Sequence, residues 1–237
     1  EQRGLLQWDG VKRKYNLHPV VRGVAAGGMD VADREHYGQR VVDHFSAQPH
    51  RPYAEAETLE DVHNGLHVVR TLIKLGRLAQ AERVYCGDLE KSLLFNLEAY
   101  AETLSLLRPF FPLGWNELPK DLSVRDGSYL AHAAAIALDA CGELQAGLAA
   151  FGTVLQADLT TQITIDSGTT LRRASLNLLN QNRIAASLRV NALAVGLSTI
   201  FQHPQSIFLS RLMLFAAQSK IGQWAEATTT WTALDPM

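Results

Sequence analysis

The sequence lacks three features that would each point to a particular class of protein. Its 237 residues contain 22 Lys and Arg against 24 Asp and Glu, which gives a formal net charge of −2 at pH 7. Binding to a phosphate backbone needs a basic excess, so we expect no nucleic-acid partner. No apolar run reaches the roughly 18 residues needed to cross a bilayer, so we expect no membrane partner. No Gly-x-x-x-x-Gly-Lys-Ser/Thr run occurs, and we therefore expect no nucleotide cofactor in this stretch of chain.

Cysteine and catalytic motifs are also scarce. The only two cysteines are Cys86 and Cys141, and both fall inside predicted helices. We therefore expect two buried, reduced thiols and a cytoplasmic location. No His-Glu-x-x-His run, nucleophile elbow or paired carboxylates mark a catalytic site. The sequence predicts a protein that is not an enzyme.

What the sequence does contain is a short stretch that occurs four times, which we call the repeated turn. Its copies are Gly76-Arg77-Leu78-Ala79-Gln80-Ala81, Gly142-Glu143-Leu144-Gln145-Ala146-Gly147, Asn182-Arg183-Ile184-Ala185-Ala186-Ser187 and Gly222-Gln223-Trp224-Ala225-Glu226-Ala227. Each copy joins two apolar-periodic segments and starts with a residue that tolerates a left-handed backbone. The last three copies are 40 residues apart, and the first precedes the second by 66, which leaves room for an extra helical element. Fixed periods of this size are typical of helical repeat arrays, so the predicted fold class is all-α.

The small residue that ends each copy is predicted to lie where two helices cross, because close approach leaves no space for a large side chain. These residues are Ala81, Gly147, Ser187 and Ala227. Four positions later stand Tyr85, Phe151, Asn191 and Trp231. We expect the aromatic members of this second set to fill the gap toward the next repeat.

The remaining segments are predicted from periodicity and turn residues. Residues 5–15 indicate a β-hairpin that turns at Asp9-Gly10. Asp30 or Asp33 is expected to cap a following helix. From Leu59 the pattern is helical almost to the end, and residues 88–107 form the longest periodic segment. Residues 109–126 are predicted to form a loop that packs as a lid or joins parts of the array.

The repeated turn with its small and aromatic residues resembles the tetratricopeptide repeat over roughly residues 59–237. The start of that repeat is degraded here, since Gly65, Val68 and Val69 stand in place of a Trp-Leu-Gly pattern. The resemblance implies a right-handed superhelix of helix pairs, in which the first helix of each pair lines the concave face. A generic α-helical solenoid remains the alternative.

The N-terminal stretch Gly4-Leu5-Leu6-Gln7-Trp8 and Tyr15-Asn16-Leu17-His18-Pro19 resembles the end of the winged-helix domain in STAND-class NTPases, the NB-ARC and NACHT proteins. In that family a Met-His-Asp motif closes the winged helix, and its His contacts the β-phosphate of ADP. Leu17-His18-Pro19 occupies the matching place, with Pro where the family often has Asp. The resemblance implies that His18 senses the nucleotide in an intact protein whose NTPase domain lies upstream, although a helix-capping or partly buried His is an equal alternative. It divides the chain into residues 1–28, the end of a winged helix, and residues 29–237, the repeat array.

Projecting the inward positions of the tetratricopeptide repeat onto this sequence predicts a binding surface of cationic and hydrogen-bonding side chains, which suits an acidic or peptide-like ligand. The projected residues are His63, Arg70, Lys74, Tyr129, His132, Asp139, Arg172, Asn180 and Lys220. His63 and His67 are also spaced to share one helix face and bind zinc, but no third ligand recurs nearby, so we interpret them as part of a solvated face.

The resemblances imply a sensor that binds a protein or peptide trigger, such as a phage protein, and controls an effector of a STAND NTPase. A stand-alone scaffold or adaptor for protein–protein interaction is the alternative from another class. A metal-dependent hydrolase is the third hypothesis, and it would require stoichiometric bound metal.

Overall fold

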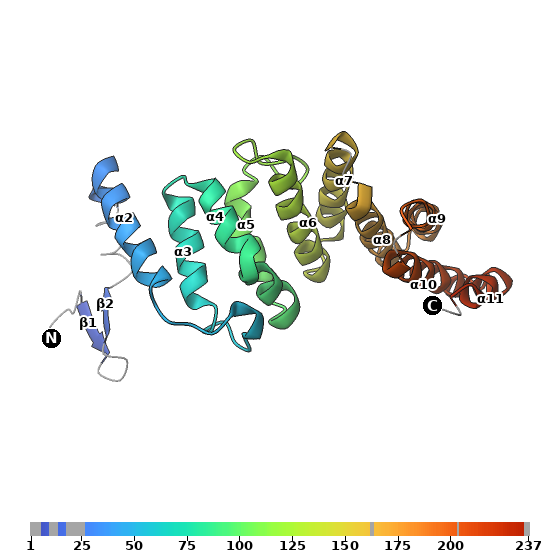
Figure 1. The fold of residues 1–237 in the computed structure, drawn as a ribbon, viewed down its shortest axis with the longest axis horizontal. Coiled ribbons are helices and arrows are strands. Elements are labelled where there is room, and N and C mark those ends of the chain that lie inside the picture. Colours follow the sequence, from blue (N-terminus) through green and yellow to red (C-terminus); the bar gives the residue numbers. More distant parts are fainter. Residues whose placement is uncertain (1–5, 10–13, 18–26, 162–163, 203, 235–237) are drawn as a thin grey trace.

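The computed structural model describes residues 6–9, 14–17, 27–161, 164–202 and 204–234, and its helices form an elongated array (Figure 1). In chain order they are α2 (Val31–Ser46), α3 (His63–Lys74), α4 (Leu78–Val84), α5 (Tyr100–Leu107), α6 (Val124–Ala140), α7 (Leu144–Thr161), α8 (Thr164–Asn180), α9 (Ile184–Ile200), α10 (Pro204–Lys220) and α11 (Trp224–Thr232). Short 3-10 and π segments are η1 (Tyr53–Glu55), η2 (Tyr85–Leu89), η3 (Ser92–Asn96) and η4 (Arg108–Phe110). Each helix from α5 to α11 packs against the next, and α3 packs against both α2 and α4. The helix-on-helix packing agrees with the predicted all-α fold class.

Two short strands precede the helices. β1 (Leu6–Asp9) and β2 (Lys14–Leu17) pair in antiparallel register. Residues 10–13 and 18–26 lie outside the described residues, and His18 is among them. The winged-helix assignment of this segment and the boundary at residue 28 therefore stay predictions.

Helix α2 contacts the array through few side chains. Asp30 caps it, because the Asp30 carboxylate accepts a hydrogen bond from the backbone N–H of Asp33 at 2.7 Å. No residue of α2 is buried, although Phe45 is half-buried against the core of α3. Arg77, in the first repeated turn, forms an ion pair with Glu35 of α2. Arg77 also donates a hydrogen bond to Gln39, so it joins α2 to the α3–α4 turn at two side chains.

All four copies of the repeated turn fold in the same way. Their first residues have a left-handed backbone, with φ of +72° at Gly76, +82° at Gly142, +59° at Asn182 and +76° at Gly222. The next residue of each copy donates its backbone N–H to the carbonyl oxygen five positions earlier, at 2.9 Å for Arg77 to Leu72, 2.9 Å for Glu143 to Leu138, 2.8 Å for Arg183 to Leu178 and 3.0 Å for Gln223 to Gln218. This is the Schellman motif, which satisfies carbonyl groups at the end of a helix. The predicted left-handed turns are confirmed.

The small residues that end the four copies are all buried, as predicted; they are Ala81, Gly147, Ser187 and Ala227. Gly147 shows why size is limited there, since a Cβ at this position would collide with the Asp139 carboxylate and lie 3.3 Å from the carbonyl oxygen of Ala135. Both of those residues belong to α6. Ser187 instead donates its hydroxyl to the carbonyl oxygen of Ser175 on α8 at 2.9 Å, which satisfies a buried polar group.

The aromatic residues that stand four positions after these small residues differ in burial along the array. Tyr85 and Phe151 are fully buried, as predicted. Trp231 is 53% exposed, so the prediction that it fills a gap toward a further repeat is wrong for the described residues. Its ring lies 5.1 Å from that of Phe215 on α10, and no described helix follows α11 to cover the other face.

The extra 26 residues between the first two copies hold α5 and the segments around it. The periodic segment 88–107 was predicted as one continuous stretch, and this is wrong. The chain leaves α4 through the π segments η2 and η3 and then reverses at Glu98, whose φ is +48°. The backbone N–H of Ala99 donates to the carbonyl oxygen of Leu93 at 2.7 Å and closes this reversal. The apolar periodicity survives because residues on both sides of the break, such as Leu93 and Leu107, enter the same core.

The loop before α6 is part of that core. Phe110 and Phe111 are buried, and the ring of Trp115 lies 5.1 Å from that of Phe111. The Arg108 guanidinium lies 5.5 Å from the centre of the Trp115 ring. The loop packs against the array through these contacts, which does not fit a lid.

Candidate functional site

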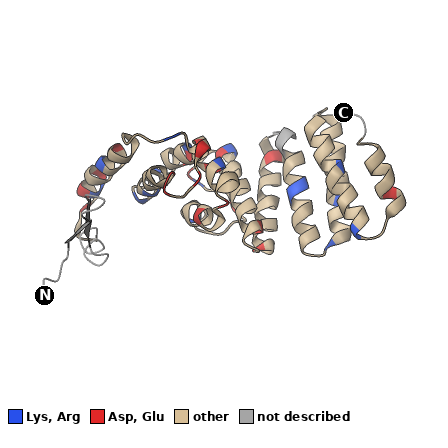
Figure 2. Cartoon of the chain, turned by 90° about the horizontal axis from the view of Figure 1, so that it is seen from below, with Lys and Arg blue, Asp and Glu red and all other residues tan. Residues whose placement is uncertain are grey.

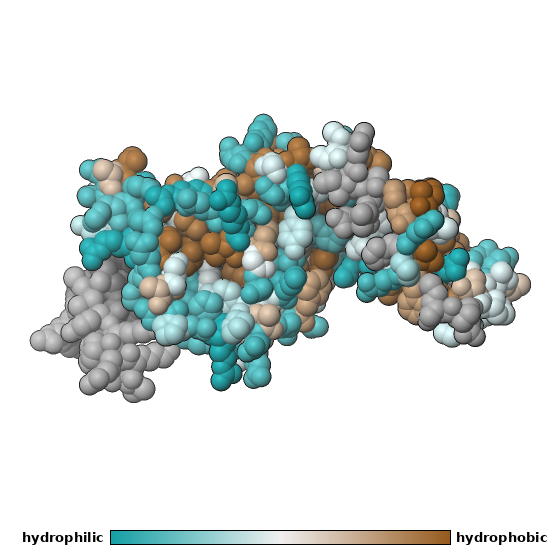
Figure 3. All heavy atoms as spheres, viewed as in Figure 1, coloured by the Kyte–Doolittle hydropathy of each residue, from teal (hydrophilic) through white to brown (hydrophobic). Residues whose placement is uncertain are grey.

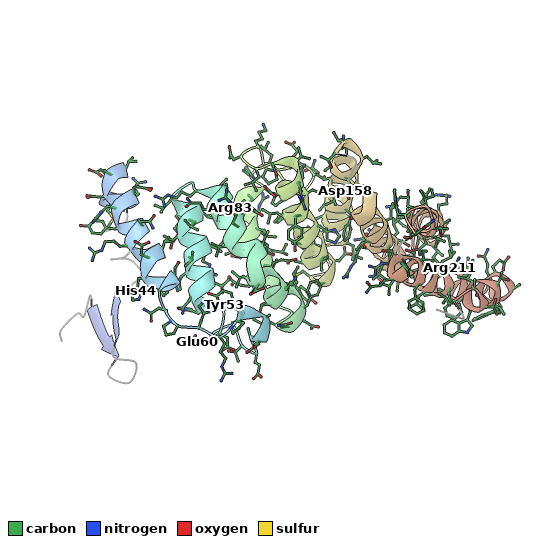
Figure 4. All side chains as sticks on the ribbon, viewed as in Figure 1. His44, Tyr53, Glu60, Arg83, Asp158 and Arg211 are labelled. Atoms are coloured by element: carbon green, nitrogen blue, oxygen red, sulfur yellow. The ribbon has the colours of Figure 1, made fainter. Side chains whose placement is uncertain are left out.

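A cavity of about 690 Å³ opens between successive helix pairs. Its walls come from the segment α4–η2–η3, from α6, from α7 and from α8. In the order of the array the α4–η2 wall and the α8 wall are separated by α6 and α7 (Figure 1). The labelled Asp158 marks the α7 wall in Figure 4. The volume lies within the range of about 300–1,000 Å³ that small-ligand sites occupy.

The α4–η2 wall carries carboxylates. Glu82, Cys86 and Glu90 follow one another at intervals of four residues and all line the cavity. Glu82 is only 8% exposed and Glu90 only 6% exposed. Burial raises the pKa of the Cys86 thiol, and the hydrogen bond to Glu82 and the charges of Glu82, Glu90 and Asp126 add to this. The thiol therefore stays protonated between the two glutamates at neutral pH.

The α6 wall contributes hydrogen-bonding side chains. The Tyr129 hydroxyl donates to Oε2 of Glu90 at 2.8 Å. Burial raises the pKa of the Glu90 carboxyl, while this hydrogen bond and the Lys91 ammonium act in the opposite direction. His132 lies one turn after Ser128 on the same wall, and its Nδ1 is 3.3 Å from the Thr170 hydroxyl of α8.

His132 is held as a neutral imidazole. Burial, together with the charges of the Arg173 and Arg172 guanidinium groups, lowers its pKa to about 4. The ring also meets the edge of Phe151, with 5.9 Å between ring centres. At pH 7 His132 therefore adds a hydrogen-bonding group to the cavity without adding a charge.

The α7 and α8 walls hold one buried carboxylate and one half-buried arginine. Asp158 is 5% exposed and accepts hydrogen bonds from Ser128 at 3.3 Å and from Ser167 at 3.5 Å. Arg173 lines the cavity from α8, and its Nε is buried with no hydrogen-bond partner among the described residues. The cavity thus has two buried glutamates on α4–η2 and Arg173 on α8. Exposed Lys91 and Arg125 and half-buried Asp126 also line it.

Of the nine residues projected from the sequence, Tyr129 and His132 line this cavity. The other seven do not line it. Three of them have partners elsewhere: Arg70 forms an ion pair with Glu102 of α5, Asp139 accepts a hydrogen bond from Asn177, and Lys220 donates to the carbonyl oxygen of Leu179 at 3.4 Å. Of the remaining four, Arg172 and His63 are half-buried, and Lys74 and Asn180 are exposed. Burial raises the pKa of Asp139 to about 6, against the hydrogen bond from Asn177 and the charge of Arg173. The structure therefore brings two of the nine together in one site.

The interpretation of His63 and His67 as a solvated helix face is wrong. Their Nε2 atoms are 3.0 Å apart, and the Phe45 ring of α2 stacks on His67 with 4.5 Å between ring centres. Both side chains are half-buried between α2 and α3. Among the described residues no group of three or more His, Cys, Asp or Glu side chains is placed to hold a metal ion.

One cysteine prediction is also wrong. Cys141 is exposed, because it is the C-cap of α6, directly before the left-handed Gly142. Cys86 is half-buried, and both cysteines are free thiols.

Sequence reasoning missed the two glutamates of the α4–η2 wall because it projected binding positions onto the first helix of each pair only. Glu82 and Glu90 lie on the second helix of the first pair and its π continuation. Their spacing with Cys86 was a usable signal, since it places polar residues along one face of a segment whose other face is apolar. Asp158 and Arg173 gave no comparable local pattern.

No family model, curated protein or solved structure matches this chain. Within the part that the structure describes, none of the helices combines the length and apolar character required to cross a bilayer.

Proposed function

We propose that this chain is a non-catalytic helical-repeat module of the cytoplasm that binds a protein or peptide trigger in the cavity between α4–η2, α6, α7 and α8. The observation that carries this proposal is the cavity itself, about 690 Å³ in volume and shared by successive helix pairs. Helical repeat arrays present extended surfaces on which neighbouring repeats contribute side chains to one ligand. The exposed rim residues Phe95, Arg125 and Tyr129 offer an aromatic anchor and polar contacts of the kind common at protein interfaces.

The finer part of the proposal is a right-handed superhelix of tetratricopeptide-like pairs that senses the trigger for a STAND-class NTPase. Its support is the four identical turns and the resemblance of the N-terminal stretch around His18 to the end of a winged helix. In this mechanism the trigger binds the open state better than the closed state and so shifts the population of an NTPase domain upstream toward activation of an effector. ATP or ADP would bind that domain.

A substitution that blocks the cavity tests the site. Thr161 is an exposed rim residue of α7, and its hydroxyl donates to the carbonyl oxygen of Ala157 at 2.9 Å. Thr160 is exposed too, makes the same kind of bond to Gln156 at 2.7 Å, and does not line the cavity. Thr160→Trp is therefore a matched control for Thr161→Trp.

We expect a ligand selected from a random heptapeptide library to bind the wild-type chain and the Thr160→Trp variant equally. Thr161→Trp should weaken binding by about tenfold or more, because the indole would occupy the space that the ligand needs. Titration by fluorescence anisotropy measures all three affinities. Equal binding to all three proteins would show that the cavity is not the site.

The sensor and the scaffold differ in what precedes this chain in its gene. An NTPase domain encoded upstream of Glu1 supports the sensor, and trigger-dependent nucleotide exchange in that longer protein would be the direct measurement. A start codon immediately before Glu1 would contradict the sensor and leave the scaffold.

A further inference from the structure

The charges that line the cavity are arranged in a way that selects among peptide ligands. Glu82 and Glu90 are each more than nine-tenths buried. The two ion pairs found among the described residues are Arg70–Glu102 and Arg77–Glu35, so neither cavity glutamate has a cation within ion-pair distance there. Cys86, between them, carries a protonated thiol and offers no charge.

A buried carboxylate without a cation is costly, and it binds an incoming cation strongly because water screens the pair poorly. Tyr129 donates one hydrogen bond to Oε2 of Glu90, which leaves further acceptor positions on that carboxylate. A Lys or Arg side chain could form charge-assisted hydrogen bonds with one of these carboxylates and be attracted at longer range by the other, because the two lie about two helical turns apart. Ile136 and Val154 also line the cavity and supply apolar contacts for the methylene stem of such a side chain.

The α8 side of the cavity needs a group of the opposite kind. The half-buried Arg173 lines this side, and neither ion pair found among the described residues includes it. His132 beside it is neutral and carries no charge that could pair with the guanidinium. An acceptor from the ligand, such as a main-chain carbonyl or a carboxylate, would pair with its guanidinium.

We infer that the cavity receives a peptide segment of the partner whose Lys or Arg side chain lies against Glu82 and Glu90 while an acceptor of the same segment faces Arg173. This inference rests on the proposed function, since it names the ligand chemistry of the same site. It also reverses the preference expected from the projected surface residues, which suited an acidic ligand.

The experiment is panning of a random heptapeptide phage library on the wild-type chain, followed by counter-selection on Thr161→Trp. Peptides that bind the first and not the second use the cavity. We expect Lys or Arg to be enriched at one position of these peptides. Replacing that residue of a selected synthetic peptide with Met should weaken binding by about tenfold or more.

The complementary experiment removes the negative charges from the protein and keeps the peptide unchanged. Glu82→Gln and Glu90→Gln, made singly, should each weaken the same peptide by about tenfold, because each keeps the side-chain shape and removes one negative charge. Asp88 lies on η2, is exposed and does not line the cavity, so Asp88→Asn should bind within about twofold of the wild type. Circular dichroism confirms that each variant is folded.

The outcomes separate the two proposals. Cavity-dependent peptides without a basic residue, or full affinity in both Gln variants, would overturn the inference and leave the proposed function standing. If panning yields no peptide that distinguishes wild type from Thr161→Trp, the proposed function itself fails and the inference fails with it.

Discussion

The helix pairs before Asn180 and those after it share one turn and differ in what they bury. The Schellman hydrogen bond after Gly142 has the same geometry as the one after Gly222, at 2.9 and 3.0 Å. Around the first turns the helices bury Tyr85, Phe151 and many leucines. The turn is thus encoded locally, whereas the burial of large side chains depends on which helices lie alongside.

The C-terminal helices pack mainly through small and polar residues. The buried residues of α9 are Ser187, Asn191, Ala194 and Ser198, those of α10 are Ser210 and Ala217, and that of α11 is Ala227. Residues 184–232 also hold only four charged side chains, Arg189, Arg211, Lys220 and Glu226, and the ribbons there are mostly tan in Figure 2. Figure 3 shows apolar atoms gathered over α9, where Leu193 and Ile200 are exposed. Contacts of this kind remove little apolar surface from water, so we expect this region to unfold first.

The largest expected effect compares equivalent positions of the two regions. Phe151→Ala should destabilise the protein by about 3–5 kcal/mol, because it leaves a cavity in a closed core. Trp231→Ala should cost about 1 kcal/mol or less, because that side chain is half-exposed and meets one ring. Urea unfolding followed by circular dichroism measures both, and hydrogen exchange assigns the loss to helices. Equal losses would show that the two regions are packed alike.

Lowering the pH should destabilise the first region in particular, because the cavity that contains His132 lies there. The unfolded chain protonates this residue below its ordinary pKa of 6.5, and the folded protein does so only below about 4. The contribution of His132 to stability is therefore complete above pH 6.5 and is lost as the pH falls toward 4. The loss amounts to about 2–3 kcal/mol.

The measurement is the difference in unfolding free energy between wild type and His132→Gln from pH 7 to pH 4.5. This difference should shrink as the pH falls. Asp139→Asn is a control whose pH dependence has the opposite sign. Burial raises the pKa of Asp139 to about 6. Ionisation of the wild-type carboxyl therefore lowers the stability of the folded protein as the pH rises through 6. A pH-independent difference for His132→Gln would contradict the buried, neutral imidazole.

The sequence predicts well those structural features that depend only on residues close together in the chain. A Gly or Asn five residues before a small residue, between two apolar stripes, is enough to place the left-handed turns at Gly76, Gly142, Asn182 and Gly222. The periodicity of residues 88–107 misled because the break at Glu98 leaves apolar residues on both sides facing the same core. The cavity required knowledge of which helices stack: Glu90, Tyr129 and Asp158 lie up to 68 residues apart and meet only after packing. The projection included Tyr129 and His132, which line the cavity, because α6 is the first helix of its pair and forms one of the cavity walls.

The smallest expected effect tests the claim that the turn is local. Gly142→Ala and Gly222→Ala both place a Cβ on a residue with φ near +80°, which costs about 1–2 kcal/mol. The added atom meets nothing within 4 Å at Gly142 and only Nε1 of Trp224, at 3.8 Å, at Gly222, so neither variant adds a clash. The two losses should therefore agree within about 0.5 kcal/mol although the surrounding packing differs. Urea unfolding measures both, and Gly152→Ala, on α7 with no contact within 4 Å and an ordinary backbone, is the control that should not destabilise. A much smaller loss at Gly222 would mean that the C-terminal turn relaxes its backbone, and hence that the loosely packed region does not hold the repeated turn as firmly as the first region does.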